Sequence, residues 1–322
     1  MVGWALPILH GLFNGVNRMG LIRTVLGDVK PESLQATMIH EHIAFDLSHV
    51  RNESDSILGD TPELANELHL TKDYGCNAFV EVTNRGMGRD VQALAELAKR
   101  LDIYIICATG FYKENVYPVE AFEKSREELA ELFVSEITAG IDGTDIKAGI
   151  IAEIGSSYQE LTKTEEKVFR AACDAHKKTG APLSTHCELG TMGIAQLRIF
   201  ESEEVDFRHI SFGHQDLNRN IDEQVTLLKS GAFIQFDTVG KNKYRPHDER
   251  VSNLLALLDK GFEDQLMLSV DLTRKSYFRQ NNGPGYVYLF DTFLPDLRNA
   301  GVPDRVIEKM LIKNPRRFLT FA

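Results

Sequence analysis

The sequence predicts an α/β fold, a (β/α)8 TIM barrel in a single domain, from three observations. Eight short apolar runs recur along the 322 residues, and a turn follows each run. Stretches of helical periodicity lie between the runs, and strands that alternate with helices indicate right-handed βαβ units around a parallel sheet. Eight such units over about 285 residues fit a closed barrel better than an open, doubly wound sheet. The runs are 36–43, 77–84, 103–110, 148–155, 182–188, 209–216, 232–240 and 266–272.

The helical stretches between these runs have recognisable ends. Residues 89–101 and 120–137 are each expected to form a helix. The segment 162–180 begins with a capping box formed by Thr162 and Glu165 and ends on a glycine, which is typical of a helix with both termini satisfied.

The first predicted strand contains the stretch "IHEHIAFDL" (39–47), in which His40 and His42 stand two residues apart. Alternate side chains of a strand face the same side, so the two histidines are expected to point together, as a pair of metal ligands would require. By the same alternation Glu41 points away from them, and we expect it to have a structural partner behind the barrel.

Later strands carry further ligand-type residues near their carboxyl ends, where a barrel of this kind builds its active site. Each of these residues alone would more often be a hydrogen-bonded core residue than a ligand. Together they would be costly to bury without partners, so the pattern predicts a metal site. The six candidate ligands are His40, His42, Glu153, His186, His214 and Asp271.

This arrangement resembles the phosphotriesterase branch of the amidohydrolase superfamily. The family shows the same "HEH" on the first strand, an acid or modified lysine on the fourth, single histidines on the fifth and sixth, and an aspartate on the eighth. The strings "VTNRGMGRD", "KAGIIAEIG", "FDTVGKNKYRP" and "DLTRKS" carry the likeness, which extends from about residue 21 to the end.

The resemblance implies two divalent metal ions, with His40, His42 and Asp271 at the buried one. It places His186 and His214 at the more exposed one. Most members bridge the two ions with a carboxylated lysine on the fourth strand.

Here no lysine stands at the bridging position, because Lys147 lies six residues earlier, so Glu153 is expected to supply the bridge. Nitrogen ligands combined with carboxylates suit zinc best, while manganese, cobalt and iron stay open.

Such a site indicates a metal-dependent hydrolase in which a hydroxide bridging the two ions attacks a small ester or lactone, and Asp271 takes the proton. Two alternatives remain open at this point. A mononuclear deaminase of the same superfamily would share the histidines, and "HCE" (186–188) is similar to its acid, although Glu153 argues for two ions. The other alternative is a barrel that binds metal without catalysis.

Cations in the loops after the seventh and eighth strands point to an anionic substrate. Lys241 and Arg245 lie in "GKNKYR" (240–245), and Arg274 lies in "TRKSYFRQNNGPGY" (273–286). These three residues are predicted to bind the substrate, for which a phosphorylated sugar lactone is our candidate. The alternative is that they pair with the 47 acidic residues of the chain.

The composition limits the classes of binding partner and the cellular compartment that we expect. A net charge of −11 argues against nucleic acid or an anionic membrane surface as a partner. The four cysteines lie far apart with no CxxC pair, which favours reduced thiols and a cytoplasmic protein. A homodimer is compatible with the sequence.

The chain divides into an N-terminal extension, residues 1–20, and one barrel domain, residues 21–322. The apolar opening "MVGWALPILHGLF" lacks the basic region and the small-residue cleavage site of a signal peptide, and it is too short to span a bilayer. Residues 21–35 are expected to cover the lower end of the barrel.

Overall fold

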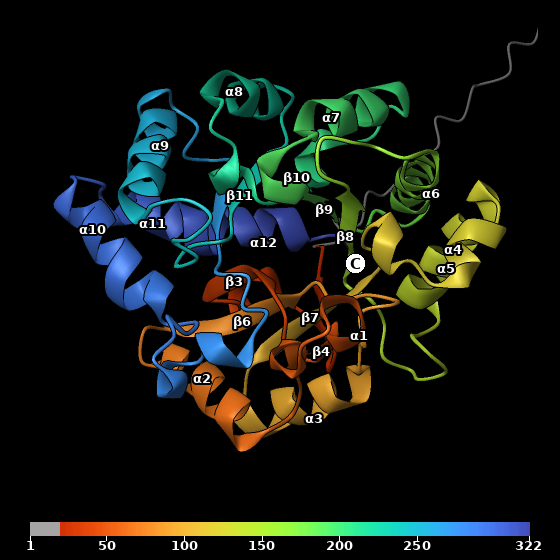
Figure 1. Cartoon of the computed structure of the whole chain (residues 1–322), viewed down its shortest axis with the longest axis horizontal. Helices are drawn as coiled ribbons and strands as arrows, with labels where there is room; N and C mark the ends of the chain where they lie inside the picture. Colours follow the sequence, from red (N-terminus) through yellow and green to blue (C-terminus); the bar gives the residue numbers. More distant parts are fainter. Residues whose placement is uncertain (1–19) are drawn as a thin grey trace, which may run out of the picture.

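The computed structural model describes residues 20–322, and eight parallel strands form its centre. Each strand pairs with the strands before and after it in the chain, from β3 at one end of the sheet to β12 at the other. The helices surround the strands in chain order (Figure 1). The strands are β3 (Ala36–Glu41), β6 (Cys76–Glu81), β7 (Tyr104–Thr109), β8 (Ile150–Ser156), β9 (Leu183–Cys187), β10 (Ile210–Phe212), β11 (Phe233–Phe236) and β12 (Leu266–Leu268).

This arrangement confirms the prediction of a single α/β domain with a nearly closed barrel, and all eight predicted strands are present. The extension predicted for residues 1–20 lies outside the described residues except for Gly20. The four cysteines are buried and free. Between residues 20 and 322, the helices are all too short or too polar to cross a membrane.

The outer helices follow the predicted positions with one correction. The stretch 120–137 forms two helices, α4 and α5, because Ser125 interrupts the first and caps the second in a capping box with Glu128. The box at Thr162 and Glu165 begins α6 as predicted. The helices are α1 (Ser48–Arg51), α2 (Pro62–Lys72), α3 (Val91–Leu101), α4 (Val119–Glu123), α5 (Arg126–Thr138), α6 (Lys163–Thr179), α7 (Gly193–Ser202), α8 (Ile221–Lys229), α9 (His247–Asp259), α10 (Leu294–Asn299), α11 (Asp304–Glu308) and α12 (Asn314–Leu319).

The lower end of the barrel is closed by segments from both ends of the described chain. A hairpin of β1 (Ile22–Thr24) and β2 (Gly27–Val29) packs so tightly on β8 that a Cβ added to Gly149 would lie 2.4 Å from the carbonyl oxygen of Arg23. Helix α12 adds Phe318, which packs with Ile22 and the inward side chains of the strands. The expected cover of this end is therefore present, and the opposite end stays available for a site.

A buried carboxylate joins the first strand to the last. No backbone ladder links β3 and β12 among the described residues. Instead Glu41 accepts hydrogen bonds from the Ser269 hydroxyl (2.6 Å) and from the backbone N–H groups of Val270 (2.8 Å) and Leu272 (3.0 Å). Burial raises the pKa of Glu41 to about 7, against the lowering effect of these donors. Glu41 thus points away from the neighbouring histidines, as predicted, and completes the barrel at its upper rim.

Replacing Glu41 by Ala should lower the free energy of unfolding by about 3 kcal/mol or more, because buried backbone donors would lose their acceptor. Urea denaturation of the metal-free protein measures this loss. Glu201→Ala, at an exposed position of α7, is the matched control and should leave the midpoint unchanged. Equal midpoints for the two variants would show that Glu41 does not hold the barrel closed.

Candidate metal centre and active-site cavity

Glu153 lies at the centre of a buried cluster at the upper end of the barrel. One of its oxygens lies 3.3 Å from Nε2 of His40 and 3.2 Å from Nδ1 of His186. The same oxygen is 4.0 Å from Nε2 of His214, and the other is 3.6 Å from Nε2 of His42. The carboxylate therefore stands between two pairs of histidines, one from the first strand and one from the fifth and sixth.

Two of these ligands depart from regular strand geometry. The pairing of β3 with β6 shifts register between Met38 and Glu41, and that of β8 with β9 shifts between Ile151 and Ile154. Such irregularities break the alternation of side chains. They turn His40 and Glu153 into the barrel although their neighbours Ile39 and Ala152 also belong to the inner cluster.

Two further candidate ligands come directly after short strands. His214 comes after β10, and Asp271 comes after β12, and both adopt left-handed backbone conformations with φ of 55° and 52°. Their side chains turn back over the barrel mouth as a result. One oxygen of Asp271 lies 3.3 Å from Nε2 of His42 and 4.0 Å from Nε2 of His40. The structure thus brings together all six of the predicted ligands.

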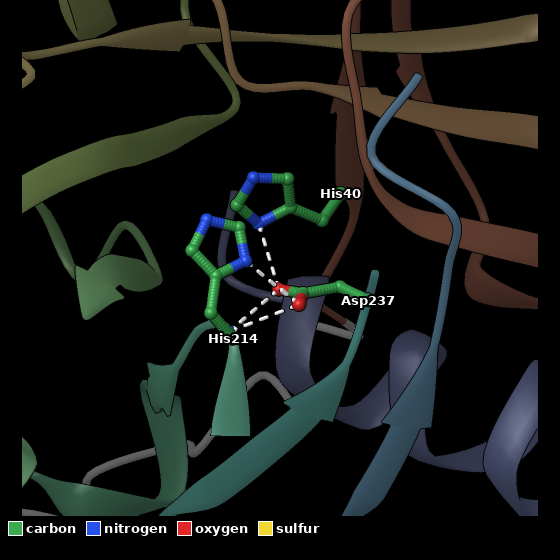
Figure 2. Close-up of side chains that lie close together, drawn as sticks. All are labelled: His40, His214 and Asp237. Atoms are coloured by element: carbon green, nitrogen blue, oxygen red, sulfur yellow. Dashed lines mark hydrogen bonds and ion pairs between the residues drawn. The ribbon is translucent and has the colours of Figure 1, made fainter. Parts of the chain in front are cut away.

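Asp237, at the end of β11 (Phe233–Phe236), orients two of the histidine rings (Figure 2). Its carboxylate lies 2.8 Å from Nδ1 of His214 and 3.1 Å from Nδ1 of His40, and it accepts the backbone N–H of His214. Thr83 contacts Nδ1 of His42 in the same way, at 2.8 Å. The Nδ1 atoms of His40, His42 and His214 thus contact side-chain oxygens of the protein, and their Nε2 atoms face the centre of the cluster. This arrangement is typical of metal-binding histidines.

The charges of the cluster fit a cation at this centre. Nε2 of His40 is buried and has no hydrogen-bond partner. Burial lowers the pKa of His40, but the flanking carboxylates of Asp237 and Glu153 outweigh it and raise that pKa well above its ordinary value. Burial would raise the pKa of Glu153, yet His186 and His40 hold it well below its usual range. The cluster therefore favours positive charge at its centre, which a metal cation would supply.

Among residues 20–322, three groups of three residues have the geometry to hold a metal ion, and two of these groups share Glu153. Within each group the potential ligand atoms lie within 4.8 Å of one another. A shared carboxylate between two histidine pairs fits a binuclear centre, because one oxygen can serve each ion. The two groups that share Glu153 are His40, His42 and Glu153, and Glu153, His186 and His214; the third is His40, His214 and Asp237.

A cavity of about 270 Å³ opens above this cluster. Lys241 lines it and forms a buried ion pair with the second oxygen of Asp271. Arg274 also lines it and donates from Nε to Glu53 (2.9 Å). Arg245, the third predicted substrate residue, does not line it.

The position of Arg245 is a correction with a clear physical reason. Its guanidinium is buried and donates to the backbone carbonyls of Asp216 (2.8 Å) and Asn218 (3.1 Å) and to the side chain of Asn253 (3.0 Å). Because these acceptors belong to the loop after β10 and to α9 (His247–Asp259), Arg245 holds two segments together.

Sequence reasoning missed three residues of the cavity wall. Arg51 is the last residue of α1 (Ser48–Arg51), donates to the Thr273 carbonyl (3.2 Å) and stacks over Phe45. Lys113 and Glu188 form an ion pair on the opposite wall, and Glu188 also lies 2.7 Å from Nε2 of His186. Arg51 and Lys113 lie outside the predicted strands, so no strand pattern identifies them as site residues. The only sequence signal for Glu188 is the "HCE" string (186–188).

A barrel with a buried cluster of histidines and carboxylates at its mouth, beneath a cavity, defines a metal-dependent hydrolase. Comparison with known families agrees, since the model of the phosphotriesterase family matches residues 20–319. The chain belongs to the phosphotriesterase family.

The similarity extends over nearly the whole length of several relatives. The phosphotriesterase homology protein of Escherichia coli is 42% identical over 282 residues, 88% of this chain and 97% of that protein. Its crystal structure, with phosphate in the active site, superposes with a TM-score of 0.87 over 89% of this chain and 99% of that one. A lactonase from Listeria monocytogenes is 31% identical, with a TM-score of 0.89 over 94% and 99% of the two chains. The human N-acetyltaurine hydrolase is 30% identical, over 94% of this chain and 98% of that protein.

Metal-free protein reconstituted with zinc in buffer free of carbon dioxide should bind about two ions per chain, because Glu153 already provides the bridging carboxylate. Elemental analysis after desalting measures the content. His40→Ala and His186→Ala should each lower it. A requirement for bicarbonate would show that a carboxylated lysine bridges the ions instead, and one ion per chain would contradict the binuclear site.

Proposed function

We propose that the protein is a binuclear metal-dependent hydrolase that opens a small anionic ester or lactone, with phosphorylated sugar lactones as the substrate class. One observation carries this proposal: Glu153 stands between two histidine pairs directly beneath a cavity whose rim carries Arg51, Lys241 and Arg274. The lactonase activity of the Listeria relative and the phosphate in the E. coli relative support the reaction type and the anionic group.

The bound ions would lower the pKa of a shared water and polarise the scissile carbonyl or phosphoryl oxygen. Asp271 is then the proton acceptor of the chain, since it faces His42 with one oxygen and lines the cavity. Lys241 holds the other oxygen, so the carboxylate stays oriented. Burial would raise the pKa of Asp271, but the Lys241 charge and His42 keep it far below its usual range, so the group is ionised and able to accept a proton.

The remaining wall residues suit substrate binding. Arg51 donates from Nη1 to the Thr273 carbonyl and the Ser56 hydroxyl, and Arg274 donates from Nε to Glu53, so each guanidinium keeps further N–H groups for a ligand. A phosphate offers several oxygens to such groups. Phe45, Met87 and Val116 form an apolar wall that limits water around the reacting bond.

The two alternatives have less support. Glu188, the residue that resembled a deaminase acid, is engaged by Lys113 and by His186. A barrel with a purely structural metal would have no need for an accessible cavity above it, lined by charged groups from separate loops. Hydrolysis is the reaction that uses both features.

Replacing Asp271 by Asn should leave most of the bound metal and lower turnover by roughly two to four orders of magnitude, because the amide keeps an oxygen ligand but cannot accept the proton. Metal content and kcat are measured on the same preparation. A variant with normal metal and a near-normal rate would place the base elsewhere.

Arg274→Ala should lower kcat/KM for a phosphorylated lactone about tenfold or more and should change the rate for its neutral counterpart much less, whereas Lys241→Ala should lower both rates because Lys241 also orients Asp271. Lys275→Ala, at an exposed position of the same loop as Arg274, is the control and should act like wild type.

A parallel assay with N-acetyltaurine separates bond types, because one relative is named for that amide. Cleavage of the amide alone would contradict the ester or lactone while keeping the hydrolase. Equal rates on charged and neutral lactones would contradict the anionic substrate.

A further inference from the structure

A second depression continues from the catalytic cavity across the upper face of the barrel. It has a volume of about 670 Å³. Leu189, Leu217 and Tyr244 line both hollows and form the threshold between them. We call the outer one the distal groove, and its walls come from the loops that follow β8, β9, β10 and β11.

Exposed apolar side chains gather in the distal groove. Among residues 20–322, eight large hydrophobic side chains are exposed, and three of them lie here: Tyr158 (54%), Leu189 (43%) and Tyr244 (42%). Exposed apolar groups that gather in one concave surface beside a catalytic cavity are typical of ligand contacts.

Several polar groups of the distal groove already have partners, whereas the Lys243 ammonium, among the described residues, only lies over the rings of Tyr244 (5.3 Å) and Tyr277 (5.7 Å). Arg219 pairs with Glu249, and Glu223 accepts from the side chains of Asn218 (3.2 Å) and Asn220 (3.1 Å). The two tyrosine rings and the leucine stay free to contact a ligand and suit an alkyl or aryl group, with Lys243 and the Gln159 amide beside them.

The turn that carries Leu189 is strained. Leu189 and Met192 both have left-handed backbone conformations, with φ of 50° and 66°. The turn is fixed nonetheless, since the Thr191 hydroxyl donates to the Glu188 carbonyl (2.8 Å) and accepts the N–H of Gln159 (3.1 Å). Strain that the surroundings enforce is characteristic of functional segments. Its effect here is to place Leu189 at the threshold, three residues after His186.

We propose that the distal groove binds an apolar substituent of the substrate while the anionic and reacting groups occupy the catalytic cavity. This inference rests on the proposed function, and it adds that the substrate extends beyond the 270 Å³ cavity with an alkyl or aryl group. A sugar phosphate without such a group would leave the distal groove empty.

Alkylphosphonates test the proposal without any catalytic step. Methyl-, butyl- and octylphosphonate share one anionic head group and differ only in apolar length, and isothermal titration calorimetry on zinc-loaded protein measures their affinities. From methyl to octyl the affinity should rise about tenfold or more, because part of each added methylene leaves water. Inorganic phosphate should compete with all three, since it takes the place of the head group.

Variants of Tyr158 locate the alkyl chain. Tyr158→Ala should remove most of the gain with length, and Tyr158→Phe, which keeps the ring, should retain it. Tyr74→Ala is the matched control, because Tyr74 is similarly exposed (48%) but precedes β6 at the opposite end of the barrel, and it should behave like wild type.

Two results would overturn the proposal. The first is an affinity independent of chain length, or a gain that Tyr158→Ala leaves intact. The second is a Tyr158→Ala variant that elutes with a different oligomeric state in size-exclusion chromatography but still binds octylphosphonate more tightly than methylphosphonate. That result would identify the distal groove as an interface between copies of the chain. Failure of lactone hydrolysis in the assays above would remove the proposed function but not the length dependence, so the two can be told apart.

Discussion

The buried negative charge of Glu153 is the constraint on which the upper end of the barrel depends. A carboxylate with 2% exposure is very costly without compensating positive charge. Four histidine rings surround it, Asp237 lies on the far side of two of these rings at their Nδ1 atoms, and Asp271 lies on the same Nε2 side as Glu153. Burial of these carboxylates together is favourable only when cations lie between them. Folding of the rim and binding of metal are therefore expected to be linked, because a metal cation would supply the positive charge that these carboxylates favour.

The rim is built so that this cluster is held by the chain itself. Glu41 ties the end of β3 (Ala36–Glu41) to the backbone just before Asp271. Arg250, which is fully buried, pairs with Asp216 and donates to the carbonyl of Lys241, and so fixes the loop that carries Lys241. Asp271 and Lys241 thus stand on segments that are anchored by buried hydrogen bonds. Rigid support of this kind places ligand atoms accurately, as a binuclear centre requires.

Much of the fold and of the cluster could be predicted from sequence, and the limits have physical causes. Apolar runs and helical periodicity reveal a barrel because burial imposes them on every strand and helix. The six candidate ligands stood out since ligand-type residues interrupt runs that are otherwise apolar. Alternation alone would not have turned both Ala152 and Glu153 inward, because a register shift is invisible in the sequence. The break between α4 and α5 was missed although Ser125 and Glu128 form a capping box.

Residues of the cavity wall were harder to foresee than the ligands. Arg245 and Arg274 look alike in sequence, as cations in adjacent loops after strands, yet one holds two loops together and the other faces the cavity. The difference depends on which carbonyls lie within reach after folding. Arg51 at the end of α1 and Lys113 in the loop after β7 reach the site from segments that carry no ligand.

Backbone strain at the site follows from the same demand for accurate placement. His214 and Asp271 both adopt φ values near +50°, a conformation that costs glycine less than other residues. Glycine, however, has no side-chain atom that could bind a metal ion. Each such residue costs on the order of 1–3 kcal/mol, which the rest of the barrel has to offset. The β10 and β12 strands are also the shortest of the eight, at three residues each. Early termination of these strands lets the chain reverse direction and bring a side chain back over the barrel axis. The strained turns after β10 and β12 thus place His214 and Asp271 in the same metal centre.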